Sequence, residues 1–453
     1  MPSRFTLFND PVHGFIAVPK GLVLSLVEQP EVQRLRRIRQ LGLGFLVFPG
    51  AVHTRFEHGI GAMALMQDAL DTLREKGTVM DTDEVGGALA AALLHDVGHG
   101  PFSHTLEHEL LPPGPSGRRH HHERMSRALM ARLDARLGGA LRTALAIFDG
   151  AYPRPFFHSL LASQLDMDRL DYLRRDSFYT GVAEGVVGVD RVIKTMRVHP
   201  APGGGRGGAA GAQPAGAQPA GAGRIVIEAK GAYAVENVLL SRRLMYGQVY
   251  LHKTVIAADH VLRAAVGRAR ERWGTDPALA ETAPPFAFFL AGRATADDLD
   301  PASDLHGPLL DAFAALDDTD VLYSLKRWAG SADRVLADLA RRFVDRDLFR
   351  TTPLDAPPPD ADVEAWRDRA AAWLVAEEIS TPATARDDAR YYVAVGRERL
   401  AAYDADRDPV CILERDGRVR ELTESTGVLA PGALGGARER DYVCLPKALD
   451  LAR

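Results

Sequence analysis

Residues 84–96, EVGGALAAALLHD, predict a helix that is apolar on nearly every side and ends in a histidine–aspartate pair. Such a helix has no face suited to water, so other elements must surround it. We therefore expect it at the centre of the fold. Thr82 or Asp83 is its expected N-terminal cap, and the polar pair His95-Asp96 is expected at its far end.

Apolar residues at helical spacing recur along most of the chain. Segment 31–42, EVQRLRRIRQLG, predicts a helix that begins near Pro30 and ends at its own C-terminal glycine. Segments 58–76, 123–137 and 159–179 predict three more helices. We therefore expect a mainly α-helical fold.

Residues 200–223 interrupt this pattern with a run rich in glycine, alanine and proline that contains GAQPA twice. This composition cannot build a packed core and predicts a flexible low-complexity insertion. Its flanks, 192–199 and 224–231, resemble short strands, so we expect the insertion at the tip of a β-hairpin. Asp416-Gly417, between two β-rich runs, predicts a second hairpin.

These patterns divide the chain into three predicted parts. Residues 1–270 form a helical core with its small hairpin, and residues 271–352 form a helical extension. A proline-rich stretch then introduces an α+β region over residues 353–453.

The composition is that of an ordinary globular protein. Of the 453 residues, 46% are hydrophobic and 25% are charged, and the net charge of -5 argues against nucleic acid as a partner. Cys411 and Cys444 do not have the spacing of a zinc site. No apolar run reaches the length of a signal peptide or a membrane span, so we expect a cytoplasmic protein without membrane association.

His58, the pair His95-Asp96, and Asp168 make up the ligand set of a divalent-metal site. Imidazole nitrogen and carboxylate oxygen suit Mn, Fe or Zn and, with waters, Mg. Ions of this kind activate water against phosphate esters, so a hydrolase is the first function to test.

A dense group of polar residues follows the apolar helix. We expect His95 and His99 to share one face of that helix, which then ends over residues 98–101. His104 and Glu107, three residues apart, begin a further turn. A carboxylate in this position orients the imidazole and raises its basicity, as a general acid or base requires.

The predicted helix over residues 159–179 has two sets of polar residues. Asp168, Tyr172 and Asp176 recur at four-residue spacing and line one face. The other charged residues are expected on the opposite face, as a solvated ion-pair surface: Asp171, Arg174 and Arg175.

Six strings occur in this order along residues 5–265: FNDPVHGFI, RLRRIRQLGLGFLVFPGAVHTRFEHGIG, LLHDVGHGPFSH, HHERMS, LDMDRLDYLRRDSF and MYGQVYLHKT. Together they resemble the HD-domain deoxynucleoside triphosphate (dNTP) triphosphohydrolases, both the bacterial enzymes and those that also contain a SAM domain, which this chain lacks. The resemblance implies an HD-domain helical core. It also implies hydrolysis of a dNTP to a deoxynucleoside and inorganic triphosphate.

The resemblance implies roles for individual residues. One divalent ion would be bound by His58, His95, Asp96 and Asp168, and a second ion, Mg, could be present in addition on the nucleotide phosphates. His104, with Glu107 and His122 behind it, would protonate the departing 5′ oxygen.

Ten residues match positions that contact the substrate in this family. Those expected around the triphosphate are Arg55, His99, Arg169, Tyr172 and Arg242. Those expected around the deoxyribose are Gln40, Leu41, Asp176 and Tyr250. The tenth, Tyr246, stands where the family pattern has a histidine and changes a phosphate or base contact.

Two further departures concern the catalytic network. Glu107 replaces an aspartate, and its longer side chain still reaches the histidines. Three adjacent side chains cannot all point at one site, so we expect His122 in the network and His120 and His121 at the surface.

The arginine-rich run 34–39 leaves two interpretations open. Its composition is typical of a solvated helix face. The resemblance instead implies a site for an activating nucleotide at the interface of a homo-oligomer, a dimer or a tetramer. Its residues would be Asn9, Glu28, Gln33 and Arg36.

Two other functions also remain open for the chain. One is an HD-type phosphodiesterase or nucleotidase that acts on another phosphate ester, and its products would distinguish it. The other is a nucleotide-binding regulator without turnover.

Overall fold

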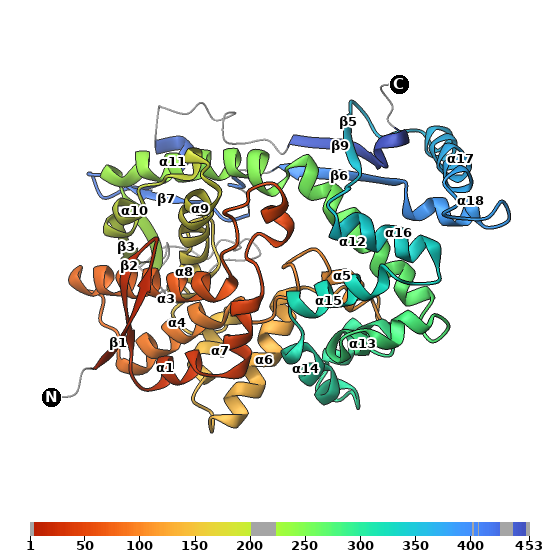
Figure 1. The fold of residues 1–453 in the computed structure, drawn as a ribbon. Helices are drawn as coiled ribbons and strands as arrows, with labels where there is room; N and C mark the ends of the chain where they lie inside the picture. The colour runs from red at the N-terminus through yellow and green to blue at the C-terminus, as the bar shows by residue number, and fades with distance from the viewer. Residues whose placement is uncertain (1–3, 201–222, 401–402, 406, 426–437, 450–453) are drawn as a thin grey trace.

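The computed structural model describes residues 4–200, 223–400, 403–405, 407–425 and 438–449. Helices dominate these residues (Figure 1), which confirms the predicted mainly α-helical fold. Most of the predicted insertion, residues 201–222, lies outside the described residues. Among the helices that the structure describes, none has the length and apolar character needed to cross a membrane.

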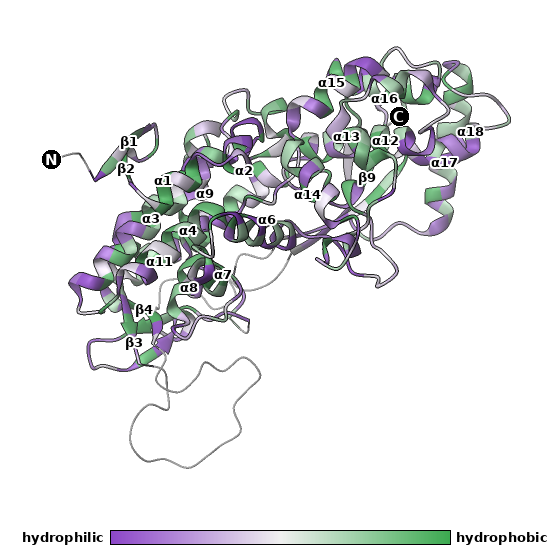
Figure 2. Cartoon of the chain, turned by 90° about the horizontal axis from the view of Figure 1, so that it is seen from below, coloured by the Kyte–Doolittle hydropathy of each residue, from purple (hydrophilic) through white to green (hydrophobic). Residues whose placement is uncertain are grey.

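Helix α4 (Thr82–Leu94) lies at the centre of the N-terminal part, between α3 (Arg55–Glu75) and α7 (Arg142–Phe148), as predicted. Every residue from Gly87 to Leu94 is buried, and the ribbon of α4 is mostly hydrophobic in Figure 2. The predicted cap was wrong by one residue. Asp81 is the N-cap, because its carboxylate accepts the Glu84 N–H at 2.8 Å.

Further helices surround this centre. In chain order they are α1 (Leu22–Val27), α2 (Pro30–Arg34), α5 (Glu107–Leu110), α6 (His122–Arg136), α8 (Phe156–Leu161), α9 (Met167–Thr180), α10 (Val189–Thr195), α11 (Ala232–Met245) and α12 (Lys253–Glu271). The helical extension adds α13 (Pro284–Leu290), α14 (His306–Ala315), α15 (Asp318–Trp328) and α16 (Arg334–Val344).

The helix predicted to end at Gly42 is shorter than expected. Helix α2 ends at Arg34, and after one 3-10 turn Ile38 is extended. The Ile38 carbonyl accepts the Arg55 N–H at 2.9 Å, so the chain leaves the helix to pair with the residues before α3.

The helix predicted over 159–179 is in fact two, α8 and α9. Asp166 starts the second, because its carboxylate accepts the N–H groups of Arg169 at 2.7 Å and Ser163 at 2.8 Å.

Three small sheets complete the fold. Strands β1 (Phe5–Asp10) and β2 (Gly14–Pro19) form an N-terminal hairpin. The second sheet has the order β3 (Met196–His199), β4 (Arg224–Glu228), β7 (Cys411–Leu413), β8 (Val419–Glu421). The third has the order β5 (Arg350–Leu354), β9 (Arg438–Leu445), β6 (Ala394–Leu400), and lies near α17 (Asp360–Ala376) and α18 (Ala385–Asp388) (Figure 1).

Both predicted hairpins are confirmed. Strands β3 and β4 are antiparallel, and so are β7 and β8, which flank Gly417 at φ 85°. Strand β7 pairs in parallel with β4, so a C-terminal hairpin extends a sheet of the N-terminal part. The predicted division at residue 353 falls within β5 and stays a prediction.

Gly98 allows the turn after α4 to contact the start of α6. A Cβ atom at this position would lie 2.1 Å from the Ser126 nitrogen and 2.4 Å from the His122 carbonyl oxygen. The Gly98 N–H also donates to Ser126 Oγ at 2.9 Å. The backbones of the turn and of α6 are therefore too close for any side chain between them.

We expect Gly98→Ala to lower the free energy of unfolding by about 2–3 kcal/mol, because backbone atoms would have to move. Gly86→Ala in α4 is the matched control, since a Cβ there would meet no atom within 4 Å. It should raise that free energy by about 0.5–1 kcal/mol. Thermal unfolding followed by circular dichroism measures both, and equal melting temperatures would contradict the packing argument.

Candidate metal centre and active site

Three of the four predicted metal ligands converge in the structure. His58 lies in the first turn of α3, His95 directly follows α4, and Asp168 lies in the first turn of α9. One donor atom from each lies within 4.8 Å of the other two. His58 Nε2 is 3.0 Å from Asp168 Oδ1 and 3.3 Å from His95 Nε2. We call these three residues the His58 cluster.

Asp96 lies beside this cluster and contacts Arg55. Its Oδ2 atom is 3.5 Å from His58 Nε2 and its Oδ1 atom is 3.5 Å from His95 Nε2. The Arg55 guanidinium forms an ion pair with the same carboxylate. A role for Asp96 as the fourth ligand stays a prediction.

The hydrogen bonds of the two imidazoles suit metal binding. His95 Nδ1 is 2.7 Å from the Ala92 carbonyl, which can only accept, so this nitrogen holds the proton. His58 Nδ1 is 2.8 Å from Asp171 Oδ2 and donates in the same way. Both Nε2 atoms therefore face the cluster, and once deprotonated they form a donor set that fits a divalent ion.

Asp171 and Arg175 are buried, so the predicted solvated surface was wrong for these two residues. Asp171 is 0% exposed and also contacts His13 Nε2 at 2.6 Å. Arg175 donates to Asp171 at 2.9 Å and to Asp10 at 2.7 Å, and so joins the N-terminal hairpin to α9. Residues three apart are only about 60° apart around a helix, so Asp171 lies on the same side as Asp168 and not opposite it.

Gly61 on α3 makes this arrangement possible. A Cβ atom there would lie 2.0 Å from Asp171 Oδ1 and 2.4 Å from Arg175 Nη2. The carboxylate and the guanidinium therefore occupy the space that a side chain on α3 would take.

Neighbouring charged groups determine the protonation states of His58 and Asp168. Burial alone lowers the pKa of His58, but its hydrogen bonds to Asp168 and Asp171 outweigh burial and raise that pKa to about 10. Burial raises the pKa of Asp168, but His58 and His95 outweigh it and hold that pKa well below its usual range. Without a metal ion, His58 is therefore an imidazolium between two carboxylates.

The turn between α4 and α5 is not helical, so the predicted shared helix face of His95 and His99 was wrong. Phe102 and Ser103 have positive φ angles of 54° and 61°. The Phe102 N–H donates to Asp318 Oδ1 at 2.7 Å, and Ser103 Oγ donates to the Arg39 carbonyl at 2.7 Å. These bonds hold a strained turn in place.

Arg34 supports the same turn from inside the protein. It is almost fully buried and donates to the carbonyls of Val97, His99 and Leu316 at 3.3, 2.6 and 2.7 Å. The interpretation of the arginine run as a solvated helix face was therefore wrong for Arg34, although Arg36 and Arg37 are exposed.

The predicted catalytic residues lie together where this turn meets α5 and α6. His104 Nδ1 is 3.4 Å and His122 Nδ1 is 3.1 Å from the Glu107 carboxylate. Burial raises the pKa of Glu107, but these histidines outweigh it and keep the pKa far below its usual range. His121 is exposed as predicted, whereas His120 is buried, so its predicted surface position was wrong.

Five predicted substrate residues form a second group, on α9, α11 and the π-helical turn Tyr246–Tyr250. Asp176 accepts the Tyr250 hydroxyl at 2.8 Å. The ring of Tyr250 lies 6.0 Å from that of Tyr172 and 4.9 Å from that of Tyr246, and Arg242 lies 5.6 Å from the Tyr246 ring. A π-helical turn is rare and is frequent at functional sites.

His53 belongs to this group and was missed. Its Nε2 atom is 2.7 Å from Asp176 Oδ1. The signal was present, because His53 lies in the string AVHTRFEHG, but no role was assigned to it.

The other predicted substrate residues lie beside Asp96, beside the turn after α4, or at the start of α9. Arg55 contacts Asp96, and His99 Nε2 is 3.3 Å from Asp96 Oδ1. Ser103 Oγ donates to the Gln40 carbonyl at 3.1 Å, which places Gln40-Leu41 beside the turn. Arg169 donates to the Ser163 carbonyl at 2.6 Å, at the start of α9.

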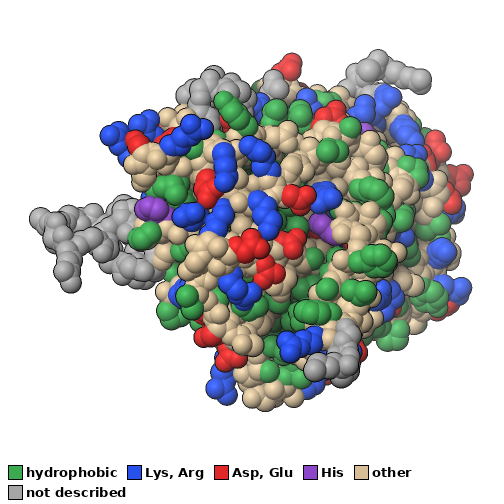
Figure 3. All heavy atoms as spheres, turned by 90° about the vertical axis from the view of Figure 1, so that its left-hand side faces the viewer, with side chains coloured by type: hydrophobic (Ala, Val, Ile, Leu, Met, Phe, Trp, Pro, Cys, Tyr) green, Lys and Arg blue, Asp and Glu red, His purple; other side chains and the backbone are tan. Residues whose placement is uncertain are grey.

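Of the predicted regulatory residues, two contact each other. Arg36 Nε donates to Gln33 Oε1 at 2.9 Å. Glu28 is the C-cap of α1. Asn9 lies in β1, on an outer face of the hairpin that exposes Phe5, Leu7 and Phe15. Hydrophobic side chains are grouped on this side of the molecule in Figure 3. The regulatory site stays a prediction.

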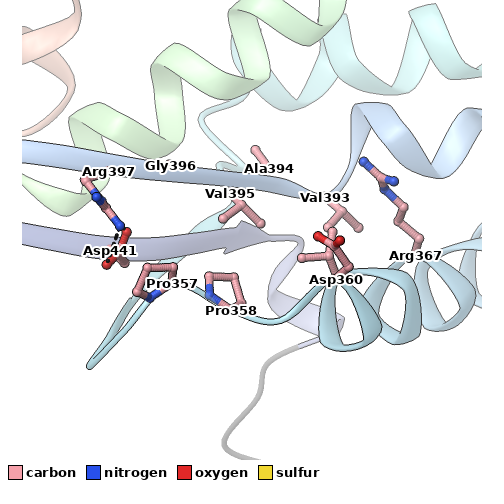
Figure 4. Close-up of a pocket in the computed structure, with 11 residues that line it drawn as sticks. Pro357, Pro358, Asp360, Arg367, Val393, Ala394, Val395, Gly396, Arg397 and Asp441 are labelled. Atoms are coloured by element: carbon pink, nitrogen blue, oxygen red, sulfur yellow. Dashed lines mark hydrogen bonds and ion pairs between the residues drawn. The ribbon is translucent and has the colours of Figure 1, made fainter.

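A cavity of about 630 Å³ lies away from these residues, between α17 and the third sheet (Figure 4). Arg397 and Asp441, which line it, form an ion pair at 2.8 Å. None of the predicted site residues lines this cavity.

Comparisons with known proteins agree with this geometry. The HD domain family matches residues 55–172, and the HD associated region matches residues 220–283. A phosphohydrolase structure from Bacteroides thetaiotaomicron is 36% identical, with a TM-score of 0.83, over 97% of this chain and 99% of that one. The chain belongs to the HD-domain phosphohydrolase family.

Other relatives of this HD-domain protein differ in their sequence identity and in the share of each chain that matches. The uncharacterized protein YwfO of Bacillus subtilis is 29% identical over 97% of this chain and 92% of its own length. The deoxynucleoside triphosphate triphosphohydrolase SAMHD1 of Xenopus laevis is 40% identical over 29% of this chain and 21% of its own length. The chain spans only 49% to 58% of three further uncharacterized relatives.

We expect metal binding at the His58 cluster to release about one proton between pH 7 and 8.5, because the His58 pKa of about 10 keeps the metal-free imidazole protonated there. The apparent affinity for Mn²⁺ should rise by about tenfold per pH unit over this range. Calorimetry in two buffers of different ionisation enthalpy measures the released protons. Binding without proton release would contradict the assigned charge of His58.

We expect Asp171→Asn to weaken Mn²⁺ binding by about 10- to 100-fold, because His58 loses the carboxylate that orients it. Arg174→Gln, on the partly exposed side of the same helix, is the matched control and should bind Mn²⁺ like the wild type. Calorimetry measures both affinities, and circular dichroism checks that both variants fold. Unchanged affinity in a folded Asp171→Asn variant would refute the positioning role.

Proposed function

We propose that this HD-domain protein hydrolyses deoxynucleoside triphosphates to a deoxynucleoside and inorganic triphosphate, with a divalent metal ion. The observation that supports this most is the position of Asp96 between two sets of side chains. Asp96 Oδ1 is 3.5 Å from His95 in the His58 cluster and 3.3 Å from His99, whose ring stacks on that of His122. A metal-activated water and a proton donor would thus meet at one site.

The His58 cluster would hold the ion, with Asp96 as a further ligand. When bound, a divalent ion lowers the pKa of a coordinated water and offsets charge on the phosphoryl oxygens. Asp171 and the Ala92 carbonyl hold the two imidazoles with their Nε2 atoms toward that position.

His104 would protonate the departing 5′ oxygen. Its side chain is 65% exposed, so a substrate can reach it. Glu107 lies 3.4 Å from His104 Nδ1 and would hold the ring with Nε2 toward the substrate.

Arginines would bind the triphosphate leaving group. Arg55, Arg169 and Arg242 come from α3, α9 and α11, and their guanidinium groups match phosphate oxygens in charge and geometry. Tyr250 would pack against the deoxyribose. Its hydroxyl donates to Asp176 at 2.8 Å, and a ring held in this way would exclude a 2′ hydroxyl.

The named relatives support the choice of substrate. SAMHD1 proteins of several animals and a SAMHD1 homolog of Dictyostelium discoideum, all named as deoxynucleoside triphosphate triphosphohydrolases, match 29% to 42% of this chain. We further propose that the protein forms a homo-oligomer that an activating nucleotide regulates.

Incubation with each dNTP and Mn²⁺, alone and in pairs, tests the reaction, with products separated by ion exchange. We expect a deoxynucleoside and intact triphosphate. Orthophosphate or a nucleoside monophosphate would indicate a phosphodiesterase or nucleotidase instead, and no product from any combination would refute catalysis. Turnover only with paired nucleotides would support the regulatory site.

Two variants separate the proposed roles. Asp168→Ala should lose both metal and turnover. His104→Ala should keep its metal and lose about 10²- to 10⁴-fold in turnover, because only the proton donor is removed. His121→Gln, an exposed neighbour of the network, is the control and should retain both. Equal metal loss in the Asp168 and His104 variants would contradict the assignment.

A further inference from the structure

His99, His104 and His122 present a second set of ring nitrogens, apart from the His58 cluster. One nitrogen from each lies within 4.8 Å of the other two. The His104 ring lies 4.7 Å from that of His99. The rings of His99 and His122 stack at 3.9 Å with an interplanar angle of 16°, so the His99 ring must turn for its lone pair to meet that of His122 at one ion. The three residues come from two positions in the turn and from the first residue of α6, so tertiary packing brings them together.

Glu107 orients two of these rings. Its carboxylate lies 3.4 Å from His104 Nδ1 and 3.1 Å from His122 Nδ1, and it also accepts the His122 backbone N–H. A carboxylate that accepts from one imidazole nitrogen directs the lone pair of the other nitrogen away from it. This is the usual environment of a metal-bound histidine.

His99 provides the third imidazole, and one of its two nitrogens has no hydrogen-bond partner among the described residues. The residue is 2% exposed, and its Nδ1 atom is buried without a hydrogen bond to any described residue. Its Nε2 atom is 3.3 Å from Asp96 Oδ1. A buried nitrogen without a partner is costly, and a bound cation would satisfy it.

Three imidazoles select the kind of ion. Neutral nitrogen donors favour Zn²⁺, Co²⁺, Ni²⁺ or Cu²⁺ over Mg²⁺, which prefers oxygen. The exposed side chain of His104 gives an ion access and leaves a fourth position for water.

We propose that His99, His104 and His122 bind a late first-row transition-metal ion such as Zn²⁺, in addition to the ion at the His58 cluster, and that this second ion inhibits hydrolysis. The inhibition rests on the proposed function, because a metal-bound His104 cannot deliver a proton to the 5′ oxygen. The binding itself does not depend on that function.

Metal stoichiometry tests the site without reference to activity. The full chain, freed of metal, is titrated with Co²⁺, and bound cobalt is counted by elemental analysis and followed by its visible absorption. We expect two equivalents in the wild type and in His121→Gln, but one in His122→Gln. Asp168→Ala should still bind the cobalt equivalent that is lost in His122→Gln.

One equivalent in the wild type, or two in His122→Gln, would overturn the proposal. Glu107→Gln provides a second variant if His122→Gln does not fold. It keeps all three nitrogens and should weaken the second equivalent by about 10- to 100-fold.

Inhibition is measured separately, by adding Zn²⁺ to hydrolysis supported by Mn²⁺. We expect hydrolysis to be half inhibited at a Zn²⁺ concentration equal to the dissociation constant of the second site. Full activity with that site occupied would overturn the inhibitory role alone. If no dNTP is hydrolysed under any condition, the proposed function and the inhibitory role fail, and the cobalt count still decides the site.

Discussion

The hydrogen bond between Asp171 and His58 is the interaction on which the candidate metal centre depends. A buried carboxylate is stable only when it is paired, and Asp171 is paired with His58, His13 and Arg175. The same bond turns His58 Nε2 toward His95 and Asp168. The N-terminal hairpin takes part as well, through His13 and the Asp10–Arg175 ion pair. The orientation of one candidate metal ligand therefore depends on residues from the hairpin, α3 and α9.

The strained turn after α4 is the second constraint. It carries Asp96, His99 and His104, and Asp96 lies between the His58 cluster and His99. Bonds from outside the turn maintain its positive φ angles, chiefly those from Arg34 and from Asp318 at the start of α15. The helical extension thus has a direct part in the geometry of the site.

Much of the fold could be predicted from sequence, because it depends on local patterns. The all-apolar helix α4 and the two hairpins follow from composition and turn residues. The errors occur where a tertiary contact outweighs a local preference. Helix α2 ends early because Ile38 and Gln40 pair with the residues before α3, and α8 and α9 separate where Asp166 caps the second helix.

The sequence by itself determined which residue types are available for the site. The pair His95-Asp96 at the end of an apolar helix, and the spacing of Asp168, Tyr172 and Asp176, identify a metal-dependent hydrolase chemistry. Only the tertiary structure decided which polar residues are buried and what they face. Asp171, Arg34 and His120 resemble surface residues in sequence, because burial of a charge or an imidazole depends on distant partners that no local pattern reveals.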